Sequence, residues 1–346
     1  MKIKIFRYLK VTLLVLTTLL LVGNVQAGFG VKYGNEFLEF GTGARENSLG
    51  GAVISNPDPV VAAYWNPAAL TQTEVMTAQI MHTEEFAGIV KNDQLFVNIP
   101  STNINWSVGL FRTGVDEIPN TQNVLIEYGP DNDTLDENDR LDYSKISYFN
   151  ASESAFFISG GKKLNSKLSI GGSFKTIHKN YFEKYSWGFG IDLGLIYQPF
   201  DNLSLGGSVR DITTTYLFWK DGKKEVVAPS LKLGGSYLLD PNFLSLKFKP
   251  MLGMDTNFEG KQNQTDLSMG FTNLRFRGGL EIIYNNLISF RTGRDDIGGL
   301  HIGCGLNTDY GTLDYGFAFG GSYSELKNSH QVALSFYIKK LWSELR

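Results

Sequence analysis

The chain has little of what marks catalytic or disulfide-stabilised exported proteins. Cys304 is the only cysteine among 346 residues, which excludes an internal disulfide framework. The four histidines (His82, His178, His301 and His330) lack the spacing of metal ligands. A net charge of −3 argues against a nucleic-acid partner. No nucleophile, orienting acid or phosphate-binding loop stands out, so we expect no enzyme, no catalytic residue and no organic cofactor.

Long apolar runs are also missing beyond the first 27 residues. Four basic residues within the first ten precede the apolar run Val11 to Val22, and Val25-Gln26-Ala27 is a typical signal-peptidase pattern. Twelve apolar residues are too few for a bilayer, which needs about 20 in a helix. We predict that residues 1–27 are a cleaved signal peptide rather than a buried helix, so the mature chain begins near Gly28.

Alternation of large apolar with small or polar residues fills most of the remaining sequence. Residues 187–198 show it plainly, and Gly (38 residues) and aromatic residues (13%) are abundant. Successive side chains of a strand point to opposite faces, so each such segment has one apolar face. The pattern predicts about fourteen strands, near 75–83, 93–100, 103–113, 153–163, 166–178, 186–198, 203–211, 229–239, 245–256, 275–285, 287–294, 299–307, 312–321 and 329–340.

The predicted connections alternate in length. Links after even-numbered strands are short, whereas the long ones, 114–152, 212–228 and 257–274, follow odd-numbered strands. Short periplasmic turns and long extracellular loops are typical of outer-membrane barrels, and a soluble β-sandwich gives no reason for them. We therefore predict an all-β membrane protein: an antiparallel transmembrane β-barrel of about 14 strands over residues 76–342, in the outer membrane of a Gram-negative-type bacterium and in contact with its lipid.

Charged residues fall on the face opposite the large apolar side chains. If the apolar face meets lipid, they line the lumen, and Glu281 and Arg291 on neighbouring strands form a cross-strand ion pair. These charges serve either barrel stability or ligand binding. The predicted lumen charges are Lys175, Asp192, Arg210, Lys247, Lys249, Arg277, Glu281 and Arg291, with His301 and Asp314 on the same face.

Residues 28–75 do not alternate. They contain a Gly-rich stretch (residues 41–52), then Asp58 as a helix N-cap, then a short helical run that Pro67 ends. A fourteen-strand barrel leaves a lumen that wall side chains do not fill. We predict that this segment is an N-terminal plug, or hatch, inside the barrel; a periplasmic extension beneath it is the alternative. The predicted plug motif comprises Gly43, Ala44, Arg45, Gly50, Gly51, Trp65, Asn66, Pro67 and Ala68.

The stretch GTGARENSLGGAVISNPDPVVAAYWNPAAL, from Gly41 to Leu70, resembles the N-terminal signature of the PorV/PorQ family within the FadL-like group of outer-membrane barrels. The segments ISYFNASESAFFISGGKKL and SHQVALSFYI resemble the middle and final strands of that family. The resemblance implies a hatch and a role in type IX secretion. Members of that type receive exported proteins with a C-terminal signal domain and pass them to cell-surface attachment machinery.

The loop 114–152 contains an acidic run. Hard oxygen ligands at close spacing suit Ca²⁺, although the spacing is not that of an EF-hand. A solvated acidic loop is the alternative to a structural calcium site. The candidate ligands are Asp131, Asp133, Asp136 and Asp139.

Two functions remain. The first is a shuttle or scaffold for secreted client proteins, working through the long loops, with Tyr216, Phe218 and Trp219 either as interface anchors or as part of a membrane belt. The second is FadL-like transport of a hydrophobic small molecule. A lumen rich in charge does not suit apolar cargo, so we favour the first.

Overall fold

The computed structural model describes residues 35–122, 124–126, 140–241, 245–257, 266–269, 272–295, 299–320 and 328–338. The predicted signal peptide lies outside these residues, as do the four candidate calcium ligands Asp131, Asp133, Asp136 and Asp139. Residues Tyr33–Arg346 form one compact unit. None of the helices in the described ranges combines the length and apolar character that a membrane span requires.

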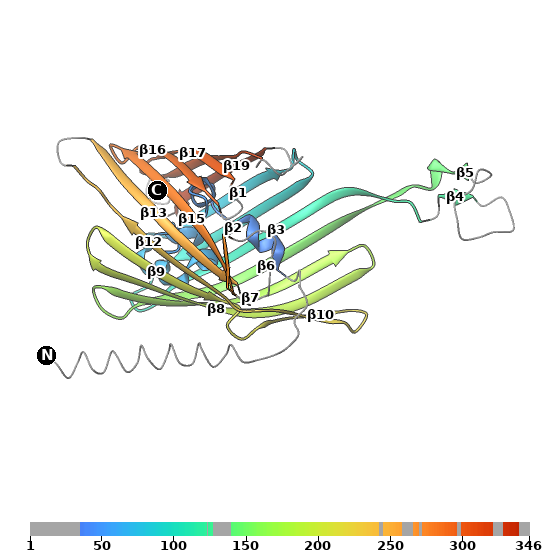
Figure 1. Ribbon diagram of the computed structural model, residues 1–346, viewed down its shortest axis with the longest axis horizontal. Coiled ribbons are helices and arrows are strands. Elements are labelled where there is room, and N and C mark those ends of the chain that lie inside the picture. Colours follow the sequence, from blue (N-terminus) through green and yellow to red (C-terminus); the bar gives the residue numbers. More distant parts are fainter. Residues whose placement is uncertain are drawn as a thin grey trace. The chain divides into compact units, whose positions relative to one another are not determined.

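Fourteen antiparallel strands form a closed wall, as predicted (Figure 1). Each strand pairs with the next along the chain, and β19 pairs with β1 to close the ring. The wall strands are β1 (Thr77–Glu85), β2 (Val90–Ile99), β3 (Asn105–Asn120), β6 (Ser147–Lys163), β7 (Leu168–Tyr181), β8 (Lys184–Phe200), β9 (Leu203–Arg210), β12 (Ser230–Tyr237), β13 (Leu246–Asn257), β15 (Thr272–Tyr284), β16 (Ile288–Arg294), β17 (Leu300–Asn307), β18 (Gly311–Ala318) and β19 (Ser329–Tyr337).

Shorter strands add to this wall at one end. The hairpin of β10 (Thr215–Trp219) and β11 (Lys224–Val227) continues the wall beside β8, and β14 (Leu267–Met269) pairs with β15. A separate two-stranded sheet contains β4 (Leu125–Ile126) and β5 (Arg140–Leu141). The wall itself therefore has the predicted strand number, and the extra strands belong to the longer connections.

The two faces of the wall differ as the alternation predicts. On β13 the side chain of Leu252 is 72% exposed and points outward, whereas Asp255 is buried and points inward. Three large apolar residues in a row interrupt the alternation of β6, and the structure places Phe157 inward, with Phe156 and Ile158 outward. Outward aromatic residues, including Trp106, Tyr237 and Tyr284, stand at one end of their strands, as in the interfacial girdles of membrane barrels.

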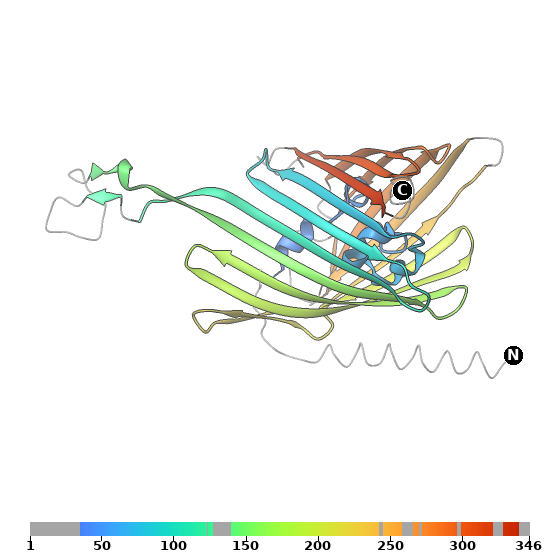
Figure 2. The same cartoon turned by 180° about the vertical axis from the view of Figure 1, so that it is seen from behind.

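The long connections all lie at one end of the wall, although the β1–β2 and β7–β8 turns at that end are short. Turns such as those around Asn165, Asp201 and Asn285 lie at the other end, here called the short-turn end, and the opposite end is the long-connection end. At the latter, β3 and β6 extend far beyond their neighbours as a two-stranded ribbon that carries β4 and β5 (Figures 1 and 2). The sequence predicted a loop over 114–152, but paired strands continue to Asn120 and resume at Ser147.

Among the described residues, the helical elements precede the wall strands, apart from η4 (Tyr143–Lys145) between β5 and β6. They form the inner segment, Glu36–Gln72, which contains η1 (Glu36–Phe40), α2 (Ala44–Ser48), η2 (Pro59–Val61), α3 (Ala62–Trp65) and η3 (Pro67–Gln72). Most of its side chains are buried, and it contacts inward positions of strands around the wall. Figure 1 shows it inside the ring of strands.

Candidate functional site

Local sequence signals shape the inner segment. Asp58 caps η2 by accepting a hydrogen bond from the backbone N–H of Val60, and Asn66 caps η3 in the same way through Ala68. Pro59 and Pro67 follow these caps, where a missing N–H is tolerated. The segment is therefore a chain of short capped turns, compact enough to fit within the wall.

Glycines on the wall allow this segment to approach closely. A Cβ at Gly171 of β7 or at Gly194 of β8 would overlap Asn66 or Pro67, and one at Gly293 of β16 would overlap the backbone of Leu49. Wall glycines thus provide the room that the turns occupy. The small-residue face that the sequence assigned to the lumen is the face against which the inner segment packs.

Asn66 is the most connected residue of the predicted plug motif. Its fully buried side-chain amide donates to the carbonyl oxygens of Ile54 (2.8 Å) and Leu195 (3.1 Å), and its Oδ1 accepts from the N–H of Ala68 (3.1 Å). One side chain therefore joins two turns of the inner segment to strand β8.

We expect Asn66→Ala to lower the free energy of unfolding by about 1–3 kcal/mol, because buried carbonyls lose their donor and η3 loses its cap. Urea unfolding in detergent, followed by tryptophan fluorescence, would measure the change. Asn66→Asp keeps the cap but removes the donor, so it separates the two contributions. A variant as stable as the parent chain would show that these bonds do not hold the segment.

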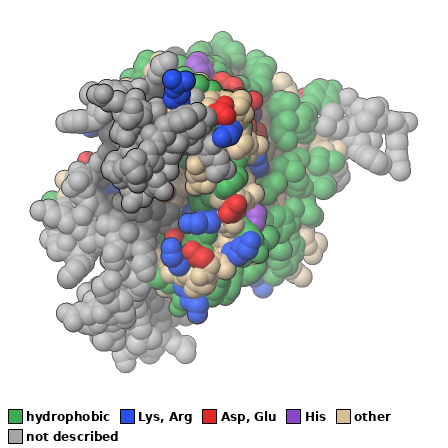
Figure 3. All heavy atoms as spheres, turned by 90° about the vertical axis from the view of Figure 1, so that its right-hand side faces the viewer, with side chains coloured by type: hydrophobic (Ala, Val, Ile, Leu, Met, Phe, Trp, Pro, Cys, Tyr) green, Lys and Arg blue, Asp and Glu red, His purple; other side chains and the backbone are tan. Residues whose placement is uncertain are grey.

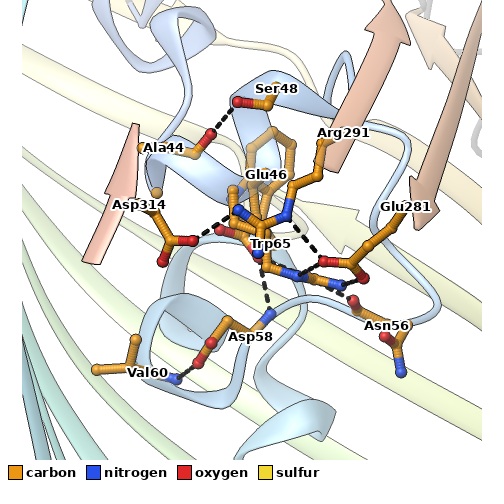
Figure 4. Close-up of polar contacts among 12 residues, drawn as sticks. Ala44, Glu46, Ser48, Asn56, Asp58, Val60, Trp65, Glu281, Arg291 and Asp314 are labelled. Carbon is orange, nitrogen blue, oxygen red and sulfur yellow. Dashed lines mark hydrogen bonds and ion pairs between the residues drawn. The ribbon is translucent and has the colours of Figure 1, made fainter. Parts of the chain in front are cut away.

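A cluster centred on Glu281 of β15 joins the inner segment to the opposite side of the wall (Figure 4). Its carboxylate accepts from Arg45 Nε (2.9 Å) and from Arg291 Nε of β16 (2.8 Å), which confirms the predicted cross-strand pair. Arg291 also binds Asp314 at 2.6 Å, and Lys249 Nζ donates to the side-chain oxygen of Asn56 at 3.2 Å.

Within the inner segment, Arg45 also binds Glu46 at 2.8 Å. The same carboxylate oxygen of Glu46 accepts from the backbone N–H of Asp58 (2.9 Å). Burial raises the pKa of Glu46 and of Asp58 above their ordinary values, because the charged carboxylates are withdrawn from water. The Arg45 guanidinium opposes that effect at Glu46 and supplies the countercharge that lets the group lie inside the barrel.

A second cluster lies at β7, β8 and β9. Lys175 is buried and contacts Asp192 at 2.9 Å and Asp211 at 2.8 Å. The guanidinium of Arg210 lies 4.5 Å from the ring centre of Tyr64 and donates to the Tyr64 carbonyl oxygen at 3.1 Å. Three of the predicted lumen charges thus lie on these adjacent strands, and Arg210 also contacts α3 through Tyr64.

The structure adds a third cluster that the sequence identified only through Arg277. Asp255 contacts Lys232 of β12 (2.6 Å) and Arg277 of β15 (3.0 Å), and Arg277 also donates to the Gly50 carbonyl oxygen at 3.2 Å. Lys232 was missed, although its position in the alternation of β12 places it inward. Lys247, also predicted for the lumen, instead pairs with Asp240 at 3.4 Å near the short-turn end.

The described metal-ligating side chains do not gather. Within the described ranges, no group of three or more His, Cys, Asp or Glu side chains is placed to hold a metal ion.

Towards the long-connection end, the inner segment packs against aromatic side chains. Phe37 and Tyr64 contact Phe111, and Tyr64 also contacts Phe157, with ring centres 5.9–6.2 Å apart. Phe40 packs against Phe86 in the turn between β1 and β2 (6.2 Å). The inner segment therefore runs from the long-connection end of the barrel towards the short-turn end, and its own rings fill this part of the lumen.

A pocket of about 310 Å³ lies where β15 and β16 separate. Two arginines and two aspartates line it together with one aromatic and one glycine: Arg277, Arg294, Asp266, Asp295, Phe276 and Gly278. Its chemistry is mixed and largely charged, which does not favour a hydrocarbon ligand.

The long-connection end presents charged and aromatic side chains. Seen from the side on which the ribbon projects, Lys, Arg, Asp and Glu side chains gather beside a hydrophobic outer wall (Figure 3). Tyr143 and Tyr148 at the ribbon are 70% and 67% exposed. Of the three predicted anchors, Tyr216 and Phe218 point outward beside Phe189, whereas Trp219 stacks on Tyr181 (5.8 Å).

The closed wall, its outward apolar face and its charged interior define an outer-membrane β-barrel protein with a FadL-like fold. Among solved structures, the P. putida toluene transporter TodX is similar at 14% identity and a TM-score of 0.56, covering 86% of this chain and 98% of that chain. A Pseudomonas aeruginosa FadL homologue is similar at 9% identity and a TM-score of 0.51, with the same coverage.

The model of one protein family matches the chain directly. Residues 177–336 match the family described as type IX secretion system membrane protein PorP/SprF. The matched part runs from β7 to β19, and so contains most of the wall. No match was found among curated protein sequences.

Proposed function

We propose that the protein acts in type IX secretion, as an outer-membrane shuttle or scaffold of the PorV/PorQ type that holds exported proteins at the cell surface. The match of residues 177–336 to the PorP/SprF family carries this proposal. The partners would be secreted client proteins and the cell-surface secretion machinery.

The contacts between the inner segment and the wall support a closed barrel rather than an open channel. Asn66 and the wall residue Arg210 tie the inner segment to the adjacent strands β8 and β9, and Arg45 ties it to β15 on another part of the ring. Moving the segment aside would separate Arg45 from Glu281. Because a buried charge without its partner is strongly destabilising, this movement would cost several kcal/mol of free energy, about 3–5 kcal/mol. We infer that the segment is a fixed plug and that the protein works through its outer surface.

The ribbon of β3 and β6 is the best candidate for that surface. Beyond Gly114 and Ala151 the two strands pair only with each other among the described residues, so the ribbon extends past the neighbouring strands. Tyr143 and Tyr148 are largely exposed there, and exposed tyrosines often become anchors of protein interfaces. Short turns are typically periplasmic, so the ribbon would face the outside.

Transport of a hydrophobic small molecule is the second candidate. Its support is the fold shared with the toluene transporter TodX and an inner segment that contains the Asn66-Pro67-Ala68 hatch motif. Against it, the aromatic rings near Tyr64 pack on one another, and the pocket between β15 and β16 is lined largely by charge.

The test is affinity capture of the tagged chain from native outer membranes in mild detergent, followed by mass spectrometry. We expect secreted proteins that share a C-terminal domain. The double change Tyr143→Ser and Tyr148→Ser should reduce their recovery roughly tenfold, the loss of an interface anchor pair.

Tyr284→Ser is the matched control, because that exposed tyrosine lies at the short-turn end. It should leave client recovery unchanged. A barrel recovered without clients but with a bound apolar compound would replace the secretion proposal with the transporter.

A further inference from the structure

The outer wall at β1, β2 and β3 gathers charged side chains at a height where most other strands carry apolar residues, with Arg294 of β16 and His330 of β19 as exceptions. These side chains form the outer-wall patch, which comprises His82, Glu84, Lys91, Asp93, Arg112 and Asp116. His82 Nδ1 lies 2.8 Å from Asp93, Arg112 lies 3.5 Å from Asp93, and Lys91 lies 3.2 Å from Asp116. Each side chain in these pairs is about 40–50% exposed.

The position of this patch along the barrel axis follows from the number of residues between each charge and the short-turn end of its strand. Asp93 lies six residues from the short-turn end of β2, and Arg112 lies seven residues from that end of β3. At about 3.4 Å per residue and a strand tilt near 40°, this places them roughly 15–18 Å above the short-turn end. The lipid-facing band of such barrels is about 25 Å tall, so Asp93 and Arg112 fall inside it, whereas Asp116, eleven residues from the same end of β3, lies beyond its far edge.

Neighbouring strands show what a lipid-facing wall has at this height. Phe156 on β6, Phe174 on β7 and Phe317 on β18 lie six or seven residues from the same end and point outward. On β8 the apolar outward face continues to Trp187, thirteen residues from that end. Figure 2 shows β1, β2 and β3 on the near side of the barrel.

Half-exposed charges inside the lipid band are unfavourable unless something polar covers them. The patch carries both signs, with Lys91 and Arg112 opposite Glu84, Asp93 and Asp116. A surface with both signs close together is complementary to a copy of itself turned by a two-fold rotation.

We propose that the outer-wall patch is the interface of a homodimer within the membrane, in which β1–β3 of one copy lie against β1–β3 of a second. The charges of the two patches then face one another instead of lipid. The proposal concerns the wall alone and does not depend on any exported client.

The test places the photoreactive residue benzoylphenylalanine at Leu95, an outward position two residues from Asp93, in the full chain in native outer membranes. The control carries it at Leu193 on β8, which has the same 44% exposure. We expect an adduct of twice the chain mass from position 95 and none from position 193. An adduct with a different protein, an equal yield at both positions, or no adduct would each overturn the homodimer.

The triple change His82→Leu, Asp93→Leu and Arg112→Leu tests the role of charge. It replaces three of the six patch side chains with leucine, as on a lipid-facing wall, so the barrel should still fold and show heat-modifiable migration in gels. We expect the dimer adduct from position 95 to fall at least tenfold. A folded variant that keeps its full adduct yield would overturn the assignment of the interface to these charges.

Discussion

Glu281→Ala is expected to lower the free energy of unfolding by about 3–5 kcal/mol, the effect of removing one partner from a buried ion cluster. Glu281 is buried and binds Arg45 and Arg291, with Lys249 at 3.9 Å. Without it, these cations face one another inside the barrel, and Arg45 loses its ion pair with β15. Urea unfolding of the detergent-solubilised barrel would measure the change.

Glu183→Ala is the control for this variant, because Glu183 is an exposed carboxylate in the turn between β7 and β8. A change within about 0.5 kcal/mol is expected there. If the two alanine variants were equally stable, the cluster would not hold the inner segment in place.

The second large effect is expected on the outer wall. Leu252→Arg places a charge at an outward position that is 72% exposed on β13, and should destabilise the barrel by about 2–4 kcal/mol. Lys249→Ser, on the inward face of the same strand, should be tolerated, since Glu281 keeps two arginines. Heat-modifiability gels of both variants would check this, and equal tolerance would contradict the assignment of the faces.

The wall could be predicted from the sequence because its signal repeats. Each strand presents the same two-residue alternation and can be recognised by itself, so an error in the bounds of one strand does not change the prediction of the others. The ribbon could not be predicted in this way. The register of β3 and β6 shifts between Val115 and Ile118, and this irregularity, with Pro119 close by, removes the alternation where the strands leave the barrel.

The candidate site could be predicted only in part. The inward charges follow from alternation alone, and the pair Glu281–Arg291 follows from strands that are neighbours in the chain. The contact of Arg45 with Glu281 joins residues 236 positions apart, which no local pattern indicates. Lys232 was missed, although it shares the inward alternation of its strand.

The fold alone does not decide between secretion and transport. The wall resembles that of a hydrocarbon transporter, while the matched family belongs to a secretion system. What distinguishes the two proposals is where a partner would bind. A transporter needs an apolar path past the inner segment, whereas a shuttle needs an exposed surface at the long-connection end. The bonds of Asn66, Arg45 and Arg210 and the exposure of Tyr148 favour the shuttle.

The most direct test of the secretion proposal is photo-crosslinking from position 148 in living cells, with benzoylphenylalanine in place of Tyr148 and mass spectrometry of every adduct. The account predicts adducts with exported proteins that share a C-terminal domain, and none when the photoreactive residue replaces Tyr284. The absence of such adducts at position 148, or an equal yield at position 284, would contradict it.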